Sequence, residues 1–404
     1  MKKVQSISER AFSTMAKIRS AYEQRIAGEA ISLEALFSPE GFRFDQFCKE
    51  FGMHPDSEVL KERIREFGEA NGCWLPGAKH HISCALYLYP GADTYRMFCM
   101  MKNLTLGFYL NDVMGRDTFC HLPPDRQASA RAMTLRMSQL DAELRLEADA
   151  EPLEVVNAEI LREFRDHSPQ WWFEQFLEVY RYHIGITHTD GNVIAQGRIP
   201  GITEYMDYRC HLGGVHHILM WIEFSDGAFL DWETLRRHGL AQPLKRLHWV
   251  VAAFAGLSND LFSFEKEVID NGSDSNLVMI VALNENGYTL EDAIGRAAGI
   301  VKGLLLELLS LLDFFAAESG KLMETHRSLG MQLRAHREGI VRCVQAVWLW
   351  HCYSGRYKRA ESLWVETRLA GTPAASATAG FKSPGATAGG GSPASSAAVF
   401  SDRG

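Results

Sequence analysis

Helical spacing of apolar residues runs through almost the whole chain, and this feature restricts the fold more than any other. Short runs that alternate apolar and polar residues between turns, as strands do, are nearly absent. About ten helices in one domain of roughly 330 residues exceed a four-helix bundle, so we predict an all-α fold with helices packed around a central feature. The predicted helices are 57–70, 94–117, 124–146, 171–183, 203–222, 235–269, 289–318 and 322–354.

The two ends of the chain differ from the helical part. Residues 371–404 are mostly Ala, Gly, Ser, Thr and Pro, with a run of glycines at 389–391. Such a segment buries too little apolar surface to fold, so a disordered tail is predicted. Residues 1–40 contain nothing that suggests chemistry and are treated as an N-terminal extension. The single folded domain is therefore expected to span residues 41–365.

Composition argues against several classes of function. The 404 residues carry a net charge of −8 without a Lys/Arg-rich run, which disfavours a nucleic-acid partner. No stretch of about 18 uncharged apolar residues occurs, so no membrane span is expected. The eight cysteines are scattered and form no Cys-x-x-Cys pair, as expected of reduced thiols in the cytoplasm.

The sharpest polar interruption of an apolar helix is residues 258–267, SNDLFSFEKE. Asn259, Ser263 and Glu267 are spaced by four residues, which places three oxygen ligands along one helix face. An amide oxygen, a hydroxyl and a carboxylate are hard ligands that suit Mg²⁺. Lys266 is adjacent and can donate to a phosphate oxygen. The alternative is an amphipathic helix end that turns towards solvent.

The pattern N-D-x-x-S-x-x-K-E resembles the second metal-binding motif of bacterial class I terpene synthases, also called terpene cyclases. It matches at the defining positions Asn259, Ser263, Lys266 and Glu267. The resemblance covers roughly residues 40–360 and implies a helical barrel around a central apolar cavity. It also implies that Asn259, Ser263 and Glu267 hold one of three Mg²⁺ ions.

An upstream aspartate-rich motif is expected in this family, and the candidate is residues 108–117, FYLNDVMGRD. It departs from the usual pair of aspartates. In one register Asn111 replaces the first aspartate, and in the other Asp112 is the first aspartate and Val113 replaces the second. We favour Asp112 as the key metal ligand.

The residues around this acid also resemble the family's pattern. Phe108 and Tyr109 lie four and three residues before Asp112, on the same side of a helix. By resemblance these aromatic rings face the substrate cation. Asp117 would be the more distant acidic metal ligand, although it does not share the face of Asp112 in an ideal helix.

A third motif is residues 205–214, YMDYRCHLGG, in which two glycines interrupt a helical pattern. Each glycine costs a helix roughly 1 kcal/mol relative to Ala, so a break is expected. By resemblance Arg209 senses the diphosphate, Leu212 links it to the break, and the carbonyl of Gly213 helps to trigger ionisation.

The fourth motif is residues 350–357, WHCYSGRY, at the end of the last strong helix. It resembles the family's C-terminal Arg-Tyr pair. Arg356 offers two parallel donors to a diphosphate, and Tyr357 adds a hydroxyl. Trp350 would face the carbocation through its ring.

Together the motifs imply an enzyme that ionises a linear isoprenyl diphosphate with Mg²⁺ and cyclises the carbocation. Farnesyl diphosphate, with fifteen carbons, is the first choice of substrate, and geranylgeranyl diphosphate the next. No dedicated general base is identified, because the diphosphate itself can take the last proton. A homodimer is compatible with the sequence.

Three alternatives stay open at this point. A head-to-tail prenyl diphosphate synthase shares the architecture but should carry two motifs that are each rich in aspartate. A non-catalytic helical scaffold would explain the helices but not the ordered polar residues. A diverged cyclase with weak activity would follow from the loss of the paired aspartates.

Overall fold

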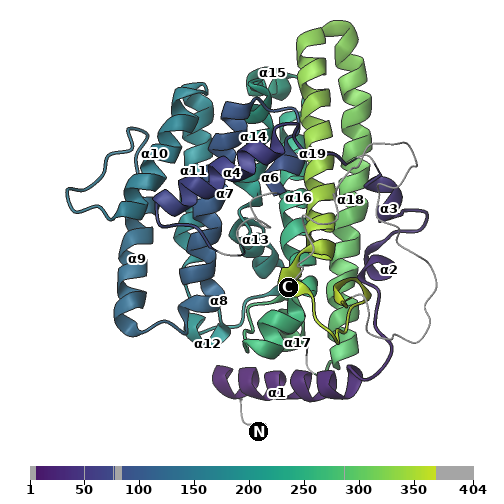
Figure 1. The fold of residues 1–404 in the computed structure, drawn as a ribbon. Coiled ribbons are helices and arrows are strands. Elements are labelled where there is room, and N and C mark those ends of the chain that lie inside the picture. The colour runs from purple at the N-terminus through teal and green to yellow at the C-terminus, as the bar shows by residue number, and fades with distance from the viewer. Residues whose placement is uncertain (1–5, 50, 76, 78–83, 286, 370–404) are drawn as a thin grey trace, which may run out of the picture.

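The computed structural model describes residues 6–49, 51–75, 77, 84–285 and 287–369 (Figure 1). The side chains of Arg116 and Asp117 are not among the described parts. The tail predicted at 371–404 lies outside the described residues.

The described residues form helices from one end to the other and contain no β-strand. Two isolated bridges join Ile31 to Trp364 and Arg359 to Arg368. The predicted all-α fold is therefore confirmed. The helices are α1 Ile7–Arg25, α2 Leu33–Phe37, α3 Phe44–Phe47, α4 Ser57–Ala70, α6 Cys84–Leu88, α7 Thr94–Met114, α8 Arg116–Phe119, α9 Pro124–Ser138, α10 Pro152–Asp166, α11 Gln170–Thr187, α12 Val193–Gln196, α13 Ile202–Leu212, α14 Val215–Asp226, α15 Trp232–Arg237, α16 Ala241–Phe262, α17 Leu277–Asn284, α18 Leu290–Thr325 and α19 Arg327–Tyr353, with the π-helical turn η1 Glu265–Asp270 and the 3₁₀ turns η2 Gly355–Tyr357 and η3 Val365–Thr367.

Local sequence explains where several helices begin. Thr289 caps α18 by accepting from the Asp292 N–H at 3.1 Å, and the Asp292 carboxylate accepts from the Thr289 N–H at 3.0 Å. This reciprocal pair satisfies two donors that a helix start would otherwise leave without partners. Helix α10 begins with Pro152, whose missing N–H costs nothing at a first helical position.

Several predicted boundaries were wrong. The helix predicted at 94–117 ends at Met114, because the backbone becomes extended at Gly115. The helix predicted at 124–146 ends at Ser138, and Leu144 beyond it adopts a positive φ of 55°. The segment 235–269 divides into α15, α16 and η1, whereas the helix predicted at 289–318 continues to Thr325.

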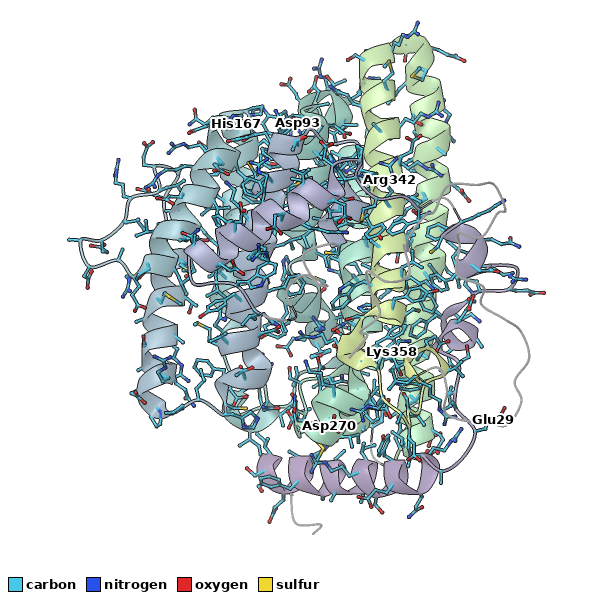
Figure 2. All side chains as sticks on the ribbon, viewed as in Figure 1. Glu29, Asp93, His167, Asp270, Arg342 and Lys358 are labelled. Atoms are coloured by element: carbon cyan, nitrogen blue, oxygen red, sulfur yellow. The ribbon has the colours of Figure 1, made fainter. Side chains whose placement is uncertain are left out.

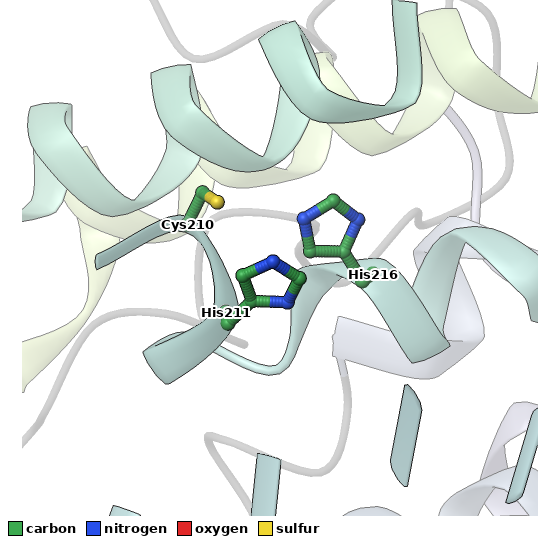
Figure 3. A group of neighbouring side chains, drawn as sticks. All are labelled: Cys210, His211 and His216. Carbon is green, nitrogen blue, oxygen red and sulfur yellow. The ribbon is translucent and has the colours of Figure 1, made fainter. Parts of the chain in front are cut away.

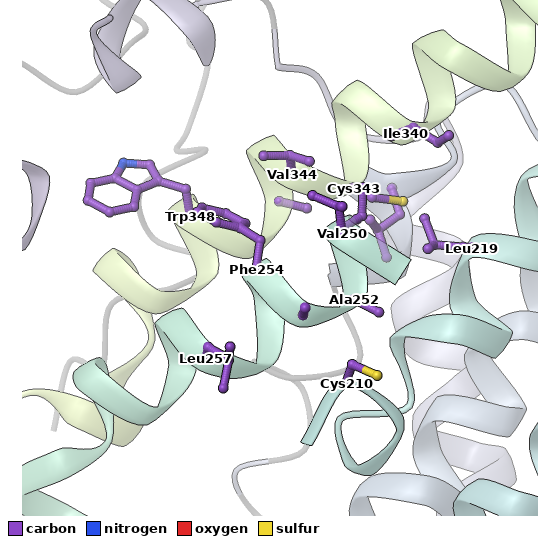
Figure 4. Close-up of a cluster of buried hydrophobic side chains, with 14 of the residues drawn as sticks. Cys210, Leu219, Val250, Ala252, Phe254, Leu257, Ile340, Cys343, Val344 and Trp348 are labelled. Atoms are coloured by element: carbon purple, nitrogen blue, oxygen red, sulfur yellow. The ribbon is translucent and has the colours of Figure 1, made fainter. Parts of the chain in front are cut away.

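Helix α16 lies in the middle of the molecule and packs against α13, α14, α18 and α19 (Figure 1). Figure 4 shows the buried contact between α16 and α19, where Phe254 lies near Val344 and Trp348. Helices α18 and α19 form a long antiparallel hairpin on one side, and α9, α10 and α11 lie on the other. Helix α1 crosses the end of the bundle and packs on α12, α17 and α18.

Charged side chains lie mostly at the periphery of this bundle, as Figure 2 shows for Glu29, Asp93 and Asp270. The interior is apolar and rich in aromatic rings, and most of α16 from Val250 to Leu257 is buried. No helix in the described part of the chain combines the length and apolar content needed to cross a bilayer. Each charged group in this interior therefore needs a partner, because burying a charge without one is costly.

Candidate active site

A cavity of about 270 Å³ lies between the helices. Its wall is formed by residues of α6, α7, α11, α13, α14, α16 and α19, together with two residues of η2 and one of η1. Phe108 and Trp350, which the resemblance places beside the substrate, are both among the lining residues. Tyr109 is not among the described residues that line the cavity. Aromatic rings from α7 and α19 therefore face the same space.

The break between α13 and α14 forms part of the wall. Helix α13 ends at Leu212, and α14 begins at Val215. Gly214 has a φ of 68°, and a Cβ there would lie 2.8 Å from His217 Cε1. The left-handed conformation would cost a residue with a side chain roughly 1–2 kcal/mol. Gly213 lines the cavity, so the predicted helix break is confirmed and borders this space.

Arg209, in the last turn of α13, is fixed by a buried acid. Its Nε donates to Asp260 Oδ1 over 2.7 Å, and the two side chains are 5% and 0% exposed. The other Asp260 oxygen accepts from Tyr205 Oη at 2.6 Å and from the Leu277 N–H at 2.8 Å. The Arg209 Nη2 donates to Asn259 Oδ1 at 2.8 Å. A positive charge is therefore held on the cavity wall next to the second motif.

Asn259, Ser263 and Glu267 continue one helical register across the end of α16. The Ser263 N–H donates to the Asn259 carbonyl and the Glu267 N–H to the Ser263 carbonyl, each at 2.8 Å. Ser263 Oγ is buried and has no hydrogen-bond partner among the described residues. An amide oxygen, an unsatisfied hydroxyl and a carboxylate are a hard donor set, so these residues fit a divalent ion such as Mg²⁺.

The amide of Asn259 is oriented by residues from the end of the chain. Its Nδ2 donates to Tyr357 Oη at 2.8 Å and lies 3.0 Å from His351 Nε2. Burial lowers the pKa of His351 to about 3, so this ring is neutral and can accept. Burial also raises the pKa of Tyr357 to about 12, so its hydroxyl keeps its proton. These contacts turn Asn259 Oδ1 towards Arg209.

The aspartate-rich motif at 108–117 contacts the C-terminal motif at 350–357. Arg356 Nη2 lies 2.9 Å from Asp112 Oδ1, and Arg356 Nη1 donates to Asp112 Oδ2 at 3.2 Å. Asn111 donates to Asp112 Oδ1 at 3.0 Å. Asn111 and Arg356 line the cavity, whereas Asp112 is not among the described residues that do.

The remaining predicted residues are less closely associated with the cavity. Lys266 is half-buried in η1 and is not among the described residues of the wall. Ser263 is likewise absent from the described wall, although its neighbours Asn259 and Glu267 belong to it. Asp117 lies in α8, but its side chain is outside the described part, so its role stays a prediction.

Sequence reasoning missed the four described histidines that line the cavity, which are His183, His188, His217 and His351. Of these, His183 of α11 and His217 of α14 lie beside each other. Their ring centroids are 5.1 Å apart. Burial lowers the pKa of His183 to about 4 and that of His217 well below its usual value, so both rings are neutral. Helical spacing could have indicated His183, because Tyr180, Ile184 and Thr187 of the same helix also line the cavity.

Cys210, His211 and His216 form a second group whose ligand atoms lie within 4.8 Å of one another (Figure 3). The two rings are stacked at 4.3 Å with only 27° between their planes. Ring nitrogens bind a metal in the plane of the ring, so nearly parallel rings do not aim at one point. The Cys210 thiol donates to the Asp207 carbonyl, and burial raises its pKa to about 12. We assign no metal to this group.

Comparison with known proteins agrees with the motifs. The family model described as terpene synthase family 2, C-terminal metal binding, matches residues 102–305, which is half of the chain. A spiroviolene synthase of Streptomyces violens is 28% identical over 292 residues, covering 69% of this chain and 78% of that protein. A (+)-eremophilene synthase of Sorangium cellulosum is 26% identical over 320 residues, covering 77% and 91%.

Solved structures show the same fold. A linalool/nerolidol synthase from Streptomyces clavuligerus, in complex with 2-fluorogeranyl diphosphate, aligns with a TM-score of 0.60 at 17% identity, covering 75% of this chain and 96% of that one. A germacradien-4-ol synthase from Streptomyces citricolor aligns with a TM-score of 0.60 at 16% identity, covering 74% of this chain and 97% of that one. The chain therefore belongs to terpene synthase family 2 and is a class I terpene cyclase, a carbon–oxygen lyase that acts on an isoprenyl diphosphate with the help of a divalent metal.

Proposed function

We propose that this cyclase ionises farnesyl diphosphate with three Mg²⁺ ions and cyclises the fifteen-carbon cation, with geranylgeranyl diphosphate as the next candidate. The observation that carries the proposal is a cavity whose wall combines Arg209, Asn259, Glu267 and Arg356 with apolar surface. Its volume of about 270 Å³ is just below the usual range for ligand sites of about 300–1,000 Å³, which supports the shorter chain. The neighbour in complex with 2-fluorogeranyl diphosphate supports the substrate class.

Asn259, Ser263 and Glu267 would hold one ion. The first motif would supply further oxygens, with Asp112 as the key metal ligand once Arg356 turns to the diphosphate, and with Asn111 beside it on the wall. Asp117 would be the more distant acidic ligand. When bound, Mg²⁺ supplies positive charge that stabilises the departing diphosphate.

The donors on the chain would bind the same diphosphate. Arg209 is held by Asp260 but keeps its Nη2 directed along the wall towards Asn259. Arg356 presents a planar fork that can bind phosphate oxygens in place of the Asp112 carboxylate. Tyr357 accepts from Asn259, so its own O–H can donate. Lys266 and the carbonyl of Gly213 are proposed as further contacts from the family resemblance.

Loss of the diphosphate leaves an allylic cation in the cavity. Phe108 and Trp350 offer ring faces that stabilise positive charge without forming a bond to it. Tyr109 is proposed from the family resemblance as a further ring beside the cation, although it does not line the described wall. Apolar walls keep water from the cation until cyclisation is complete.

The cellular compartment and the oligomeric state also stay proposals. All eight cysteines are free thiols and five are buried, which supports a reducing compartment such as the cytoplasm. A homodimer stays a prediction from the sequence.

The test is a product assay with Mg²⁺ and isoprenyl diphosphates of ten, fifteen and twenty carbons, analysed by gas chromatography–mass spectrometry. We expect a cyclic hydrocarbon or alcohol from the fifteen-carbon substrate, and none in the presence of EDTA. A cyclic product from the twenty-carbon substrate alone would overturn the chain-length assignment. A longer linear diphosphate as product would overturn cyclisation and favour the chain-elongating alternative.

A further inference from the structure

The proposed function leaves the last chemical step without a residue, because the final carbocation must lose a proton to become a hydrocarbon. We therefore considered the buried titratable groups on the cavity wall that bind neither the metal nor the diphosphate. His183 and His217 are the two such groups among the described lining residues whose rings lie within 3.3 Å of a Cβ placed on Gly214, at the helix break. The inference below rests on the proposed function.

The hydrogen bonds of His183 fix where its proton lies. Thr187 Oγ1 donates its hydrogen to the His183 carbonyl at 2.7 Å. It therefore has no hydrogen left for His183 Nδ1, which lies 3.2 Å away. The Nδ1 atom is also 3.2 Å from the His211 carbonyl, which can only accept. Both neighbours of Nδ1 are thus acceptors, so Nδ1 carries the hydrogen and Nε2 keeps its lone pair.

The Nε2 atom lies next to the break between α13 and α14. A Cβ placed on Gly214 would lie 3.3 Å from His183 Nε2, so the glycine leaves space beside the nitrogen. No described residue donates a hydrogen bond to Nε2. The ring lines the cavity, as do Gly213 and Gly214. A basic atom without a partner therefore borders the space where the cation would form.

The surroundings keep this ring neutral. Burial is the main reason that the pKa of His183 falls to about 4, and it outweighs the hydrogen bond to the His211 carbonyl, which raises the pKa. The other ring packed against it, His217, is neutral for the same reason. At physiological pH the Nε2 lone pair is therefore available in every molecule.

His217 is less suited to the same task. Its Nδ1 is buried without a hydrogen-bond partner. Its ring packs edge-on against Tyr180 at 5.5 Å and Trp221 at 5.4 Å, so aromatic neighbours restrict its approach to a substrate. No hydrogen bond from a described residue fixes its tautomer.

We propose that His183 Nε2 is the catalytic base that takes the terminal proton. The C–H bond next to the cationic carbon breaks, its electron pair forms the C=C bond, and the proton forms the Nε2–H bond. The imidazolium then passes this proton to the released diphosphate or to water before the next turnover. A carbocation is a far stronger acid than an imidazolium, so a weakly basic ring is sufficient.

The test separates this role from the structural bond to His211. In His183→Asn the side-chain amide can still donate to the His211 carbonyl, because its nitrogen takes the place of Nδ1, but the basic Nε2 is removed. His183→Gln is the second variant and places a non-basic amide near the position of Nε2. His217→Phe is the matched control on the same wall. Diphosphate release and product distribution are measured for each.

We expect diphosphate release to stay within about twofold of wild type in His183→Asn, while the wild-type hydrocarbon falls by about tenfold or more relative to alcohols and earlier-deprotonated products. His217→Phe should retain the hydrocarbon. An unchanged product distribution in both His183 variants would overturn the proposal, as would an equal change in His217→Phe or a wild-type product that is entirely alcohol. Absence of any product from wild type would instead refute the proposed function.

Discussion

Asp260 gives the sharpest prediction about stability. Its carboxylate is fully buried and accepts from Arg209 Nε, Tyr205 Oη and the Leu277 N–H at 2.6–2.8 Å. Asp260→Asn keeps the shape but removes the charge that balances the buried guanidinium. Breaking one partner of a buried ion pair costs about 3–5 kcal/mol, because the remaining charge stays desolvated. We therefore expect a loss of that size in the free energy of unfolding.

The chain offers a matched control for this prediction. Arg246 and Glu307 form an ion pair of similar geometry, with contacts of 2.6 and 2.8 Å, but their side chains are 48% and 38% exposed. Glu307→Gln should cost less than about 1 kcal/mol, because water screens the exposed pair. Urea unfolding followed by tryptophan fluorescence measures both variants. Equal losses for the buried and exposed pairs would refute the reasoning.

Gly214, Ser263 and two buried histidines give three further predictions. Gly214→Ala should cost about 1–2 kcal/mol of unfolding free energy from its positive φ, and more from the contact with His217, so a thermal midpoint unchanged by the mutation would contradict it. Ser263→Ala should weaken Mn²⁺ binding, measured by electron paramagnetic resonance. Its thermal midpoint should stay within about a degree of wild type, because Ser263 Oγ makes no hydrogen bond to a described residue. An unchanged Mn²⁺ affinity would remove Ser263 from the metal site. Burial lowers the pKa of His188 and His336 to about 4, so the unfolded chain binds more protons than the folded chain below about pH 6.5. The free energy of unfolding should therefore fall by about 2 kcal/mol per histidine between about pH 7 and pH 5. A thermal unfolding midpoint that stays constant between about pH 7 and pH 5 would contradict this.

Local patterns in the sequence predicted the features that local forces determine. Helical spacing indicated an all-α fold, and the paired glycines at 213–214 indicated the break between α13 and α14. The spacing of Asn259, Ser263 and Glu267 indicated one helical register, because each interval is closed by one backbone hydrogen bond. The π-helical turn that carries Glu267 was not predicted, although such turns are frequent at functional sites.

Contacts between distant residues could not be predicted in this way. Arg356 and Asp112 are 244 positions apart, and nothing near either one indicates that they pair. Asp260 stands inside the second motif, but its role depends on Arg209, 51 positions earlier. The orientation of His183 likewise depends on a carbonyl of another helix. These pairings depend on how the helices pack, which the periodicity of each helix does not specify.

We propose that a divalent metal held on the Asn259–Glu267 face drives ionisation of the substrate. The most direct test measures diphosphate release from farnesyl diphosphate as a function of Mg²⁺ concentration, for wild type and for Glu267→Gln. We expect release that needs Mg²⁺, stops with EDTA and falls by at least about a hundredfold in Glu267→Gln, since the metal supplies several kcal/mol of charge stabilisation. Release that persists in EDTA, or that is equal in the two proteins, would contradict it.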